Sequence, residues 1–202
     1  MKSKIILFCI FFLVLPLNYS CVALTVKGDP AYIEGNAPAD IGISLFNGRA
    51  TKNIRSSNGR FRTAHTATAG LYEVVFFTKD KYLPKAVVLK AGEDAGTIRL
   101  SSLQKLKDGK KGVVTGVVYK PESGGKLESR EGILGFFEGG IIKLTGAGVS
   151  YSTSAGRSGV FTIEVPEGEY DIALGSKRIG KVSVAQGKTT IKSIGKGKVL
   201  ID

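Results

Sequence analysis

A motif that occurs twice, about a hundred residues apart, limits what this chain can fold into. The copies span residues 58–74 and 158–172. Each contains a glycine, a phenylalanine two residues later, an alternating run, a second glycine, and a tyrosine two residues after that glycine. These residues are Gly59, Phe61, Gly70 and Tyr72 in the first copy and Gly159, Phe161, Gly168 and Tyr170 in the second. The repetition predicts two similar domains rather than one large domain.

The N-terminus has the pattern of a secretory signal peptide. Lys2 and Lys4 precede an apolar run over residues 5–15, and Pro16 follows it. A transmembrane helix needs about 20 apolar residues, which is more than this run provides. We therefore predict that residues 1–23 are a signal peptide and that the protein is exported to the periplasm or the cell surface.

Two ways of processing this segment remain open. Cleavage after Ala23 leaves a mature chain that begins at Leu24 and has no cysteine, because the chain contains only Cys9 and Cys21. Alternatively, the sequence ending at Cys21 resembles a bacterial lipobox, and a lipid on Cys21 would be the protein's membrane contact. Asn18 stands where a lipobox has an aliphatic residue, which favours cleavage. Neither outcome allows a disulfide framework.

The chain is basic throughout its length. The formal net charge is +12, and it falls to +10 in the predicted mature chain because the signal peptide contains Lys2, Lys4 and no acid. The positive charge is spread over both halves and the segment between them, and the two locally basic stretches, 103–111 and 188–199, contain no interleaved aromatic residues. This distribution favours attraction to a negatively charged envelope and gives no support for nucleic-acid binding.

Short alternating segments separated by glycine-rich turns predict an all-β fold of two tandem antiparallel Greek-key β-sandwiches. We place the first domain at 24–101, a polar hinge at 102–111, and the second domain at 112–202. The first domain is expected to begin with a strand at 24–27 and to continue through a loop into a second strand at 41–46. The segment 71–77 reads as the most apolar strand of this half.

The second half resembles carboxypeptidase regulatory-like, or transthyretin-like, domains. The resemblance covers most of 112–194 and rests on GVVTGVVY, IIKLTGAG, SGVFTIEVPEGEYDIAL and VSVAQGKTT. The first half matches more loosely through APADIGISLFNG, NGRF, GLYEVVF and VVLKAG. In that family the repeated glycines turn the chain and the aromatic residues are buried between the sheets. The resemblance implies β-sandwiches of transthyretin-like or immunoglobulin-like type and a role as an accessory, adhesive or folding module, and it implies no particular activity.

The sequence predicts no catalytic, cofactor or metal site. His65 is the only histidine, and we expect it at the surface in the polar stretch 63–68. It has no cysteine or second histidine with which to hold zinc. Asp29, Glu34 and Asp40 occupy one expected loop, but they lack the spacing of a calcium loop. The chain also ends in KGKVLID rather than in the Tyr-Arg-Gly-Ser run of the family's hydroxyisourate hydrolases. A hydrolase is therefore the least favoured class.

The repeat is interrupted at residues 121–140, where the second domain has an insertion. This insertion contains an apolar run, of which Ile133, Leu134, Phe136 and Phe137 are the candidate partner-binding residues. The run either packs over an end of the sandwich or is presented to a partner, with Tyr119 or Lys126 at the rim. Exchange of both phenylalanines for serine separates the two alternatives. A large loss of stability would argue for packing, and lost binding at unchanged stability would argue for a partner.

Together these features favour a non-catalytic, exported binding or scaffold module that contacts another envelope or surface protein. Self-association by pairing of edge strands is a variant of this hypothesis. The alternative is a carbohydrate-binding module, in which Tyr32, Tyr82 and Tyr151 would stack on sugars.

The mature N-terminus provides the first test. We expect mass spectrometry of the protein from its native membrane and envelope fractions to show a chain that begins at Leu24. A chain that begins at Cys21 and carries the added mass of acyl groups would contradict this expectation and would establish the lipid anchor.

Overall fold

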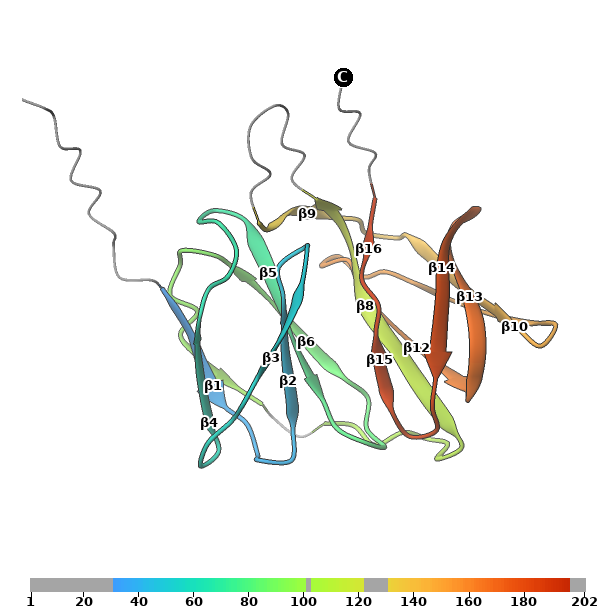
Figure 1. The fold of residues 1–202 in the computed structure, drawn as a ribbon, viewed down its shortest axis with the longest axis horizontal. Helices are drawn as coiled ribbons and strands as arrows, with labels where there is room; N and C mark the ends of the chain where they lie inside the picture. Colours follow the sequence, from blue (N-terminus) through green and yellow to red (C-terminus); the bar gives the residue numbers. More distant parts are fainter. Residues whose placement is uncertain (1–30, 101–102, 122–130, 197–202) are drawn as a thin grey trace, which may run out of the picture.

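A computed structural model describes residues 31–100, 103–121 and 131–196. In these ranges the chain forms 16 strands and no helix (Figure 1), so the predicted all-β class is confirmed. Among the described residues, accordingly, no helix is long and apolar enough to cross a membrane. The predicted signal peptide, the expected strand at 24–27 and Cys21 lie outside the described ranges.

The first sandwich contains seven strands. They are β1 (Tyr32–Asn36), β2 (Gly42–Phe46), β3 (Thr51–Ile54), β4 (Arg60–Ala64), β5 (Tyr72–Thr78), β6 (Lys85–Lys90) and β7 (Thr97–Arg99). One sheet has the order β4-β1-β7, and the other places β5 between β2 and β6, with β3 beside β2. All of these pairings are antiparallel except that of β1 with β7.

The second sandwich repeats this topology. Its strands are β8 (Lys111–Pro121), β10 (Ile141–Gly146), β11 (Val149–Ser154), β12 (Val160–Pro166), β13 (Gly168–Leu174), β14 (Lys177–Val184), β15 (Thr189–Ile191) and β16 (Ile194–Gly195). β8 takes the place of β1, since it pairs with β12 in antiparallel and with β15 and β16 in parallel orientation. The sheet β11-β10-β13-β14 corresponds to β3-β2-β5-β6. The predicted tandem Greek-key sandwiches are thus confirmed, and each includes a parallel pairing.

β1 lies where a loop was expected, and the reason is a glycine. In β1 only Ile33 and Gly35 face inward, so the strand lacks a clear apolar alternation. A Cβ at Gly35 would lie 2.7 Å from the Phe61 ring, which fills the space that a side chain would otherwise occupy. β1 therefore cannot be recognised from its own sequence, because Phe61 of the partner strand β4 fills the core position above Gly35.

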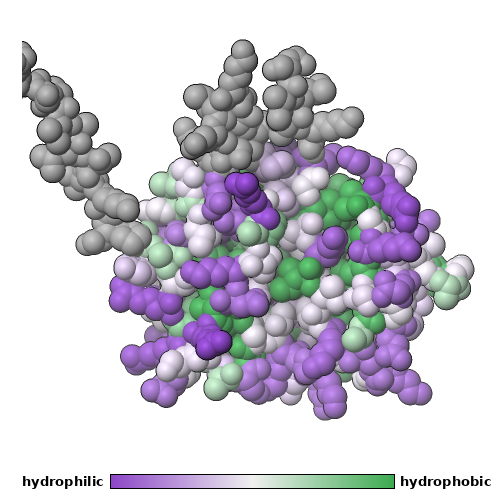
Figure 2. Space-filling model, in the orientation of Figure 1, coloured by the Kyte–Doolittle hydropathy of each residue, from purple (hydrophilic) through white to green (hydrophobic). Residues whose placement is uncertain are grey.

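The strands stack as four layers, which run from left to right in Figure 1; the two inner layers, called here the inner sheets, belong to one nine-stranded sheet. The first sandwich core lies between the β4-β1-β7 sheet and the sheet of β2 and β5, and the second lies between the sheet of β8 and β12 and the β11-β10-β13-β14 sheet. A third apolar cluster lies between the two inner sheets and joins the sandwiches. We call this cluster the joint; its fully packed members are Phe46, Val74, Phe76, Val117 and Ile133. Figure 2 shows hydrophilic residues around the rim of one face, with hydrophobic residues confined to small patches between them.

The joint explains why β5 and β8 have nearly continuous apolar sequences. In β5 the side chains of Val75 and Phe77 face the first core, whereas those of Val74 and Phe76 face the joint. Strands that are buried on both faces lose the polar alternation of a half-exposed strand. The apolar run predicted at 71–77 is therefore part of an inner layer.

β9 (Ile133–Phe136) has no counterpart in the first sandwich and lies within the predicted insertion. It pairs with β8 and, through Ile133 opposite Tyr72, with β5. The two inner sheets are thereby connected by hydrogen-bonded strands as well as by apolar packing. Close approach of backbones accompanies this connection, because a Cβ at Gly48 would lie 2.7 Å from the carbonyl oxygen of Gly132.

Polar contacts surround this end of the joint. The Tyr119 hydroxyl donates a hydrogen bond to the Gly48 carbonyl at 2.7 Å, and its ring meets Phe46 edge-on at 5.3 Å. Burial raises the pKa of Tyr119, so the phenol retains the proton that it donates. The Asn47 amide also donates to the Glu131 carboxylate at 3.1 Å.

The opposite end of the joint is closed by the segment that precedes β8. The backbone of Leu106 donates to the Lys81 carbonyl at 2.9 Å, and the Lys81 backbone donates to the Gly187 carbonyl at 2.7 Å. Asp80 and Lys188 form an ion pair across the same boundary. The Leu106 side chain is buried. The expectation of a polar hinge is therefore wrong for residues 103–106, which are bound to the first sandwich.

The contribution of β9 can be measured by comparing two adjacent apolar residues. Ile133 is fully buried, whereas Leu134 is 54% exposed. We expect Ile133→Ala to lower the free energy of unfolding by about 2–5 kcal/mol because it leaves a cavity in the joint. Leu134→Ala should change it by less than about 0.5 kcal/mol. Urea denaturation followed by circular dichroism measures both, and equal effects would contradict the proposed packing.

Candidate functional site

The apolar run of the insertion is mostly packed against the protein itself. Ile133 is fully buried, and Phe136 is half-buried against Tyr72, with ring centroids 5.4 Å apart. Phe137 packs against the second core, and the amines of Lys120 and Lys196 lie 5.0 and 4.3 Å from its ring centroid. Leu134 alone among the four candidates is exposed. Partner binding by this run stays a prediction. Leu134 is the candidate residue whose exposed side chain is best placed to contact a partner.

The other residues singled out from the sequence lie apart from this run. The repeated glycines Gly59, Gly70, Gly159 and Gly168 all have positive φ, as turns require. Phe61, Phe161 and Tyr170 are buried in the two sandwich cores, whereas Tyr72 packs against the joint. Lys126 lies outside the described residues, as does Cys21, whose lipidation stays a prediction.

His65 is buried, contrary to the expectation of a surface position. Only 5% of its side chain is exposed, and none of the side chain of Glu73, with which it pairs. The imidazole Nδ1 faces Glu73 Oε1, and Nε2 lies 3.1 Å from the Glu93 carbonyl oxygen. A carbonyl oxygen only accepts, so Nε2 carries a hydrogen.

Glu73 organises the loop after β4. Its Oε2 accepts hydrogen bonds from the Thr66 hydroxyl at 3.0 Å and from the backbone amides of Thr66 and Ala67 at 3.2 and 3.3 Å. The same loop continues to Thr68, whose amide donates to the Glu131 carbonyl at 2.7 Å. The buried pair therefore supports the entry to β9. Both ring nitrogens of the only histidine are used in this support.

Each tyrosine considered for sugar stacking has one close neighbour at its ring. The Arg62 guanidinium lies 4.0 Å from the Tyr32 ring centroid, and the Lys79 amine lies 5.0 Å from that of Tyr82. Tyr151 meets Tyr170 edge-on at 6.0 Å.

The acids considered for calcium are also engaged elsewhere. Glu34 lies on β1 beside Arg62, and a hydrogen bond from Lys79 lowers the pKa of Asp40. In the described ranges no three His, Cys, Asp or Glu residues come together as a set that could hold a metal ion. Asp29 lies outside these ranges.

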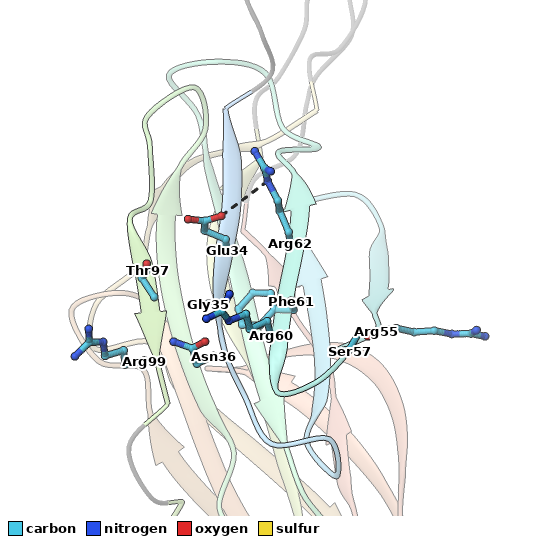
Figure 3. Close-up of a pocket in the computed structure, with 10 residues that line it drawn as sticks. All are labelled: Glu34, Gly35, Asn36, Arg55, Ser57, Arg60, Phe61, Arg62, Thr97 and Arg99. Atoms are coloured by element: carbon cyan, nitrogen blue, oxygen red, sulfur yellow. Dashed lines mark ion pairs between the residues drawn. The ribbon is translucent and has the colours of Figure 1, made fainter.

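A groove of about 740 Å³ lies over the outer face of the β4-β1-β7 sheet. Its lining includes Arg55, Arg60, Arg62 and Arg99, and Glu34 is the only acid among the lining residues. We call it the arginine groove. Figure 3 shows Arg60 beside Asn36 in the middle, Arg62 directed toward Glu34, and Arg55 pointing away from the others. The sequence showed the charges on either side of Phe61. It could not show that Arg99 lies on the other side of β1 from them, because that follows from the order of the strands in the sheet.

The sheet fixes where these side chains lie. Asn36 of the central strand is opposite Arg60 on one side and Arg99 on the other. Two residues along, Glu34 is opposite Arg62 and Thr97. Arg62 and Glu34 form an exposed ion pair at 3.9 Å, which contributes little stability and can exchange partners. The arrangement provides guanidinium groups on both sides of a central polar strand.

No protein-family model matches the sequence, and a search of curated proteins finds no match. Among solved structures, the chain is similar to the Bacillus anthracis TIE protein (11% identity, TM-score 0.32, 82% of this chain and 33% of that chain). It is also similar to BcpA, the major pilin subunit of Bacillus cereus (10%, 0.32, 83% and 59%), and to the minor pilin of Streptococcus agalactiae (9%, 0.31, 82% and 83%). The chain thus spans from one third to three fifths of the length of the first two.

The buried pair gives a stability prediction. We expect Glu73→Ala to lower the free energy of unfolding by roughly 3–5 kcal/mol, because it leaves His65 and two backbone amides without their acceptor. Glu93→Ala is the matched control, since its side chain is exposed and His65 contacts only its backbone. Chemical denaturation measures both. If His65→Ala and Glu73→Ala have additive effects in a double-mutant cycle, the two side chains do not act as a pair.

Proposed function

We propose that this chain is an exported, non-catalytic module that binds or scaffolds another protein at the bacterial envelope or surface. The observation that carries the proposal is the joint, in which β9 and the apolar cluster connect two sandwiches as one body. A body of this kind holds its outer sheets in fixed positions. Surfaces that are fixed before binding lose less conformational entropy when a partner binds.

The chemistry of the buried groups supports a binding role. Acid–base catalysis most often depends on histidine, and the single histidine here is enclosed by Glu73 and the Glu93 carbonyl. The buried Thr115 hydroxyl likewise donates to the Phe161 carbonyl at 2.8 Å and connects β8 to β12. These groups act in the fold, which leaves the exposed faces to interact with other molecules.

The signal-peptide pattern supports a function outside the cytoplasm. The predicted mature chain keeps a formal charge of +10, which favours residence beside a negatively charged envelope. The resemblance to carboxypeptidase regulatory-like domains adds a module type that occurs as an accessory part of exported proteins. In this proposal the protein contributes surfaces and spacing rather than a reaction.

Site-specific crosslinking in the native cell tests the proposal. We expect a photoreactive residue placed at the exposed Leu134, or at the exposed Thr97 of β7, to give discrete adducts with one or a few envelope proteins, identified by mass spectrometry. The same residue at the exposed Lys181 of β14 serves as a comparison site. Adducts with glycan alone, supported by hits in a glycan-binding screen, would favour the carbohydrate-binding alternative. The absence of protein adducts from every exposed site would overturn the proposed function.

A further inference from the structure

The arginine groove has an unusual choice of basic residue. The chain contains 21 lysines and eight arginines. The groove nevertheless takes four of those arginines and no lysine. Lysine is sufficient for solubility and for general attraction to a negative surface, whereas arginine offers a planar fork of donors that binds a carboxylate through two hydrogen bonds. The composition therefore points to recognition of particular oxyanions rather than to general positive charge.

The spacing of the arginines matches an extended peptide. Arg60 and Arg62 lie on the same face of β4 and are two residues apart, which separates them by about 6.6–6.8 Å along the strand. Alternate side chains of an extended ligand peptide have the same separation. Arg99 lies across the sheet from Arg60, two strand spacings or about 9.6 Å away. A peptide that lies over β1 would thus have guanidinium groups on both sides.

The central strand of the groove distinguishes a peptide from a uniformly anionic polymer. Glu34 and Asn36 of β1 face the groove between the arginines. The Glu34 carboxylate repels a chain that carries a negative charge on every unit. A peptide can instead place a backbone N–H group there and direct its carboxylates to the arginines. The groove contains hydrogen-bond donors and acceptors. A peptide with acidic side chains offers carboxylates to the donors and backbone N–H groups to the acceptors.

We propose that the arginine groove binds an extended acidic segment of a partner protein, with carboxylates at alternating positions opposite Arg60 and Arg62 and with Arg99 facing the segment from the other side of β1. This inference rests on the proposed function and identifies the chemistry of the partner. Recognition is mainly electrostatic, so binding weakens as salt screens the charges.

Titration of the purified mature chain, residues 24–202, with two synthetic peptides tests the site. One peptide alternates Glu and Ser, and the other has the same composition with all its Glu residues in one block. By calorimetry or fluorescence anisotropy we expect the alternating peptide to bind at least 5-fold more tightly, from the spacing of the arginines along β4. Equal affinity for the two peptides would overturn the alternating arrangement.

Substitutions locate the binding and test the role of arginine. We expect the double variant Arg60→Ala with Arg99→Ala to weaken binding by about 10-fold or more, and Arg60→Lys with Arg99→Lys to weaken it by about 3-fold or more, since lysine keeps the charge but loses the fork. Arg157→Ala is the matched control, because Arg157 is exposed on the second sandwich. Circular dichroism melting confirms that each variant folds. Peptide affinity that is unchanged in both groove variants would overturn the site.

Two further outcomes separate the partner classes and the two proposals. Tighter binding of inorganic polyphosphate or of heparin than of the alternating peptide, with the same dependence on Arg60 and Arg99, would overturn the assignment to an acidic peptide. If crosslinked protein adducts in the cell persist in the double alanine variant while no peptide binds, this inference fails and the proposed function stands. If no exposed site gives a protein adduct, the proposed function itself fails.

Discussion

The burial of β5 and β8 on both faces is the constraint on which the rest of the structure depends. Each of these strands contributes side chains to its own sandwich core and, on its other face, to the joint. Separate sandwiches would expose an apolar surface on each, with Phe46 and Phe76 on the first and Val117 on the second, and a soluble monomeric domain seldom presents such a surface. The two halves of the repeat are therefore not independent units on a hinge. They are the two sides of a four-layer body, and the insertion supplies the strand that connects its inner layers.

The buried pair of His65 and Glu73 supports the connection between the inner sheets through the loop after β4. Glu73 faces the end of the first core and would be costly there without partners. His65 and the loop amides provide those partners, and the loop then passes its Thr68 amide to Glu131, at the entry to β9. Glu73, an acidic residue in a largely apolar strand, thus holds the loop that contacts the entry to β9. It also accounts for the only histidine without assigning it any chemistry.

Local patterns in the sequence predicted the all-β class, the repeated turns and the place of the insertion, because strand alternation and turn glycines are set by neighbouring residues. The features that escaped prediction depend on residues far apart in the chain. β1 is hidden because Phe61 fills the space above Gly35. The burial of His65 depends on Glu73, which stands in a strand that otherwise reads as core. The contact of Ile133 with Tyr72 joins residues from different halves, and the arginine groove requires the register of three strands.

The two copies of the repeated motif show why the candidate site lies in the first sandwich. In both copies the phenylalanine faces a core, so the residues on either side of it face the opposite side of the sheet. In the first copy that side is open to solvent, and the flanking residues are Arg60 and Arg62. In the second copy the equivalent sheet is an inner layer, and the flanking residues are Val160 and Thr162, both partly buried. The alternation that buries Phe61 thereby directs two arginines outward from the same five-residue strand. One motif serves the fold in both copies, and its position in the stack of layers determines that only the first copy can also present a charged surface.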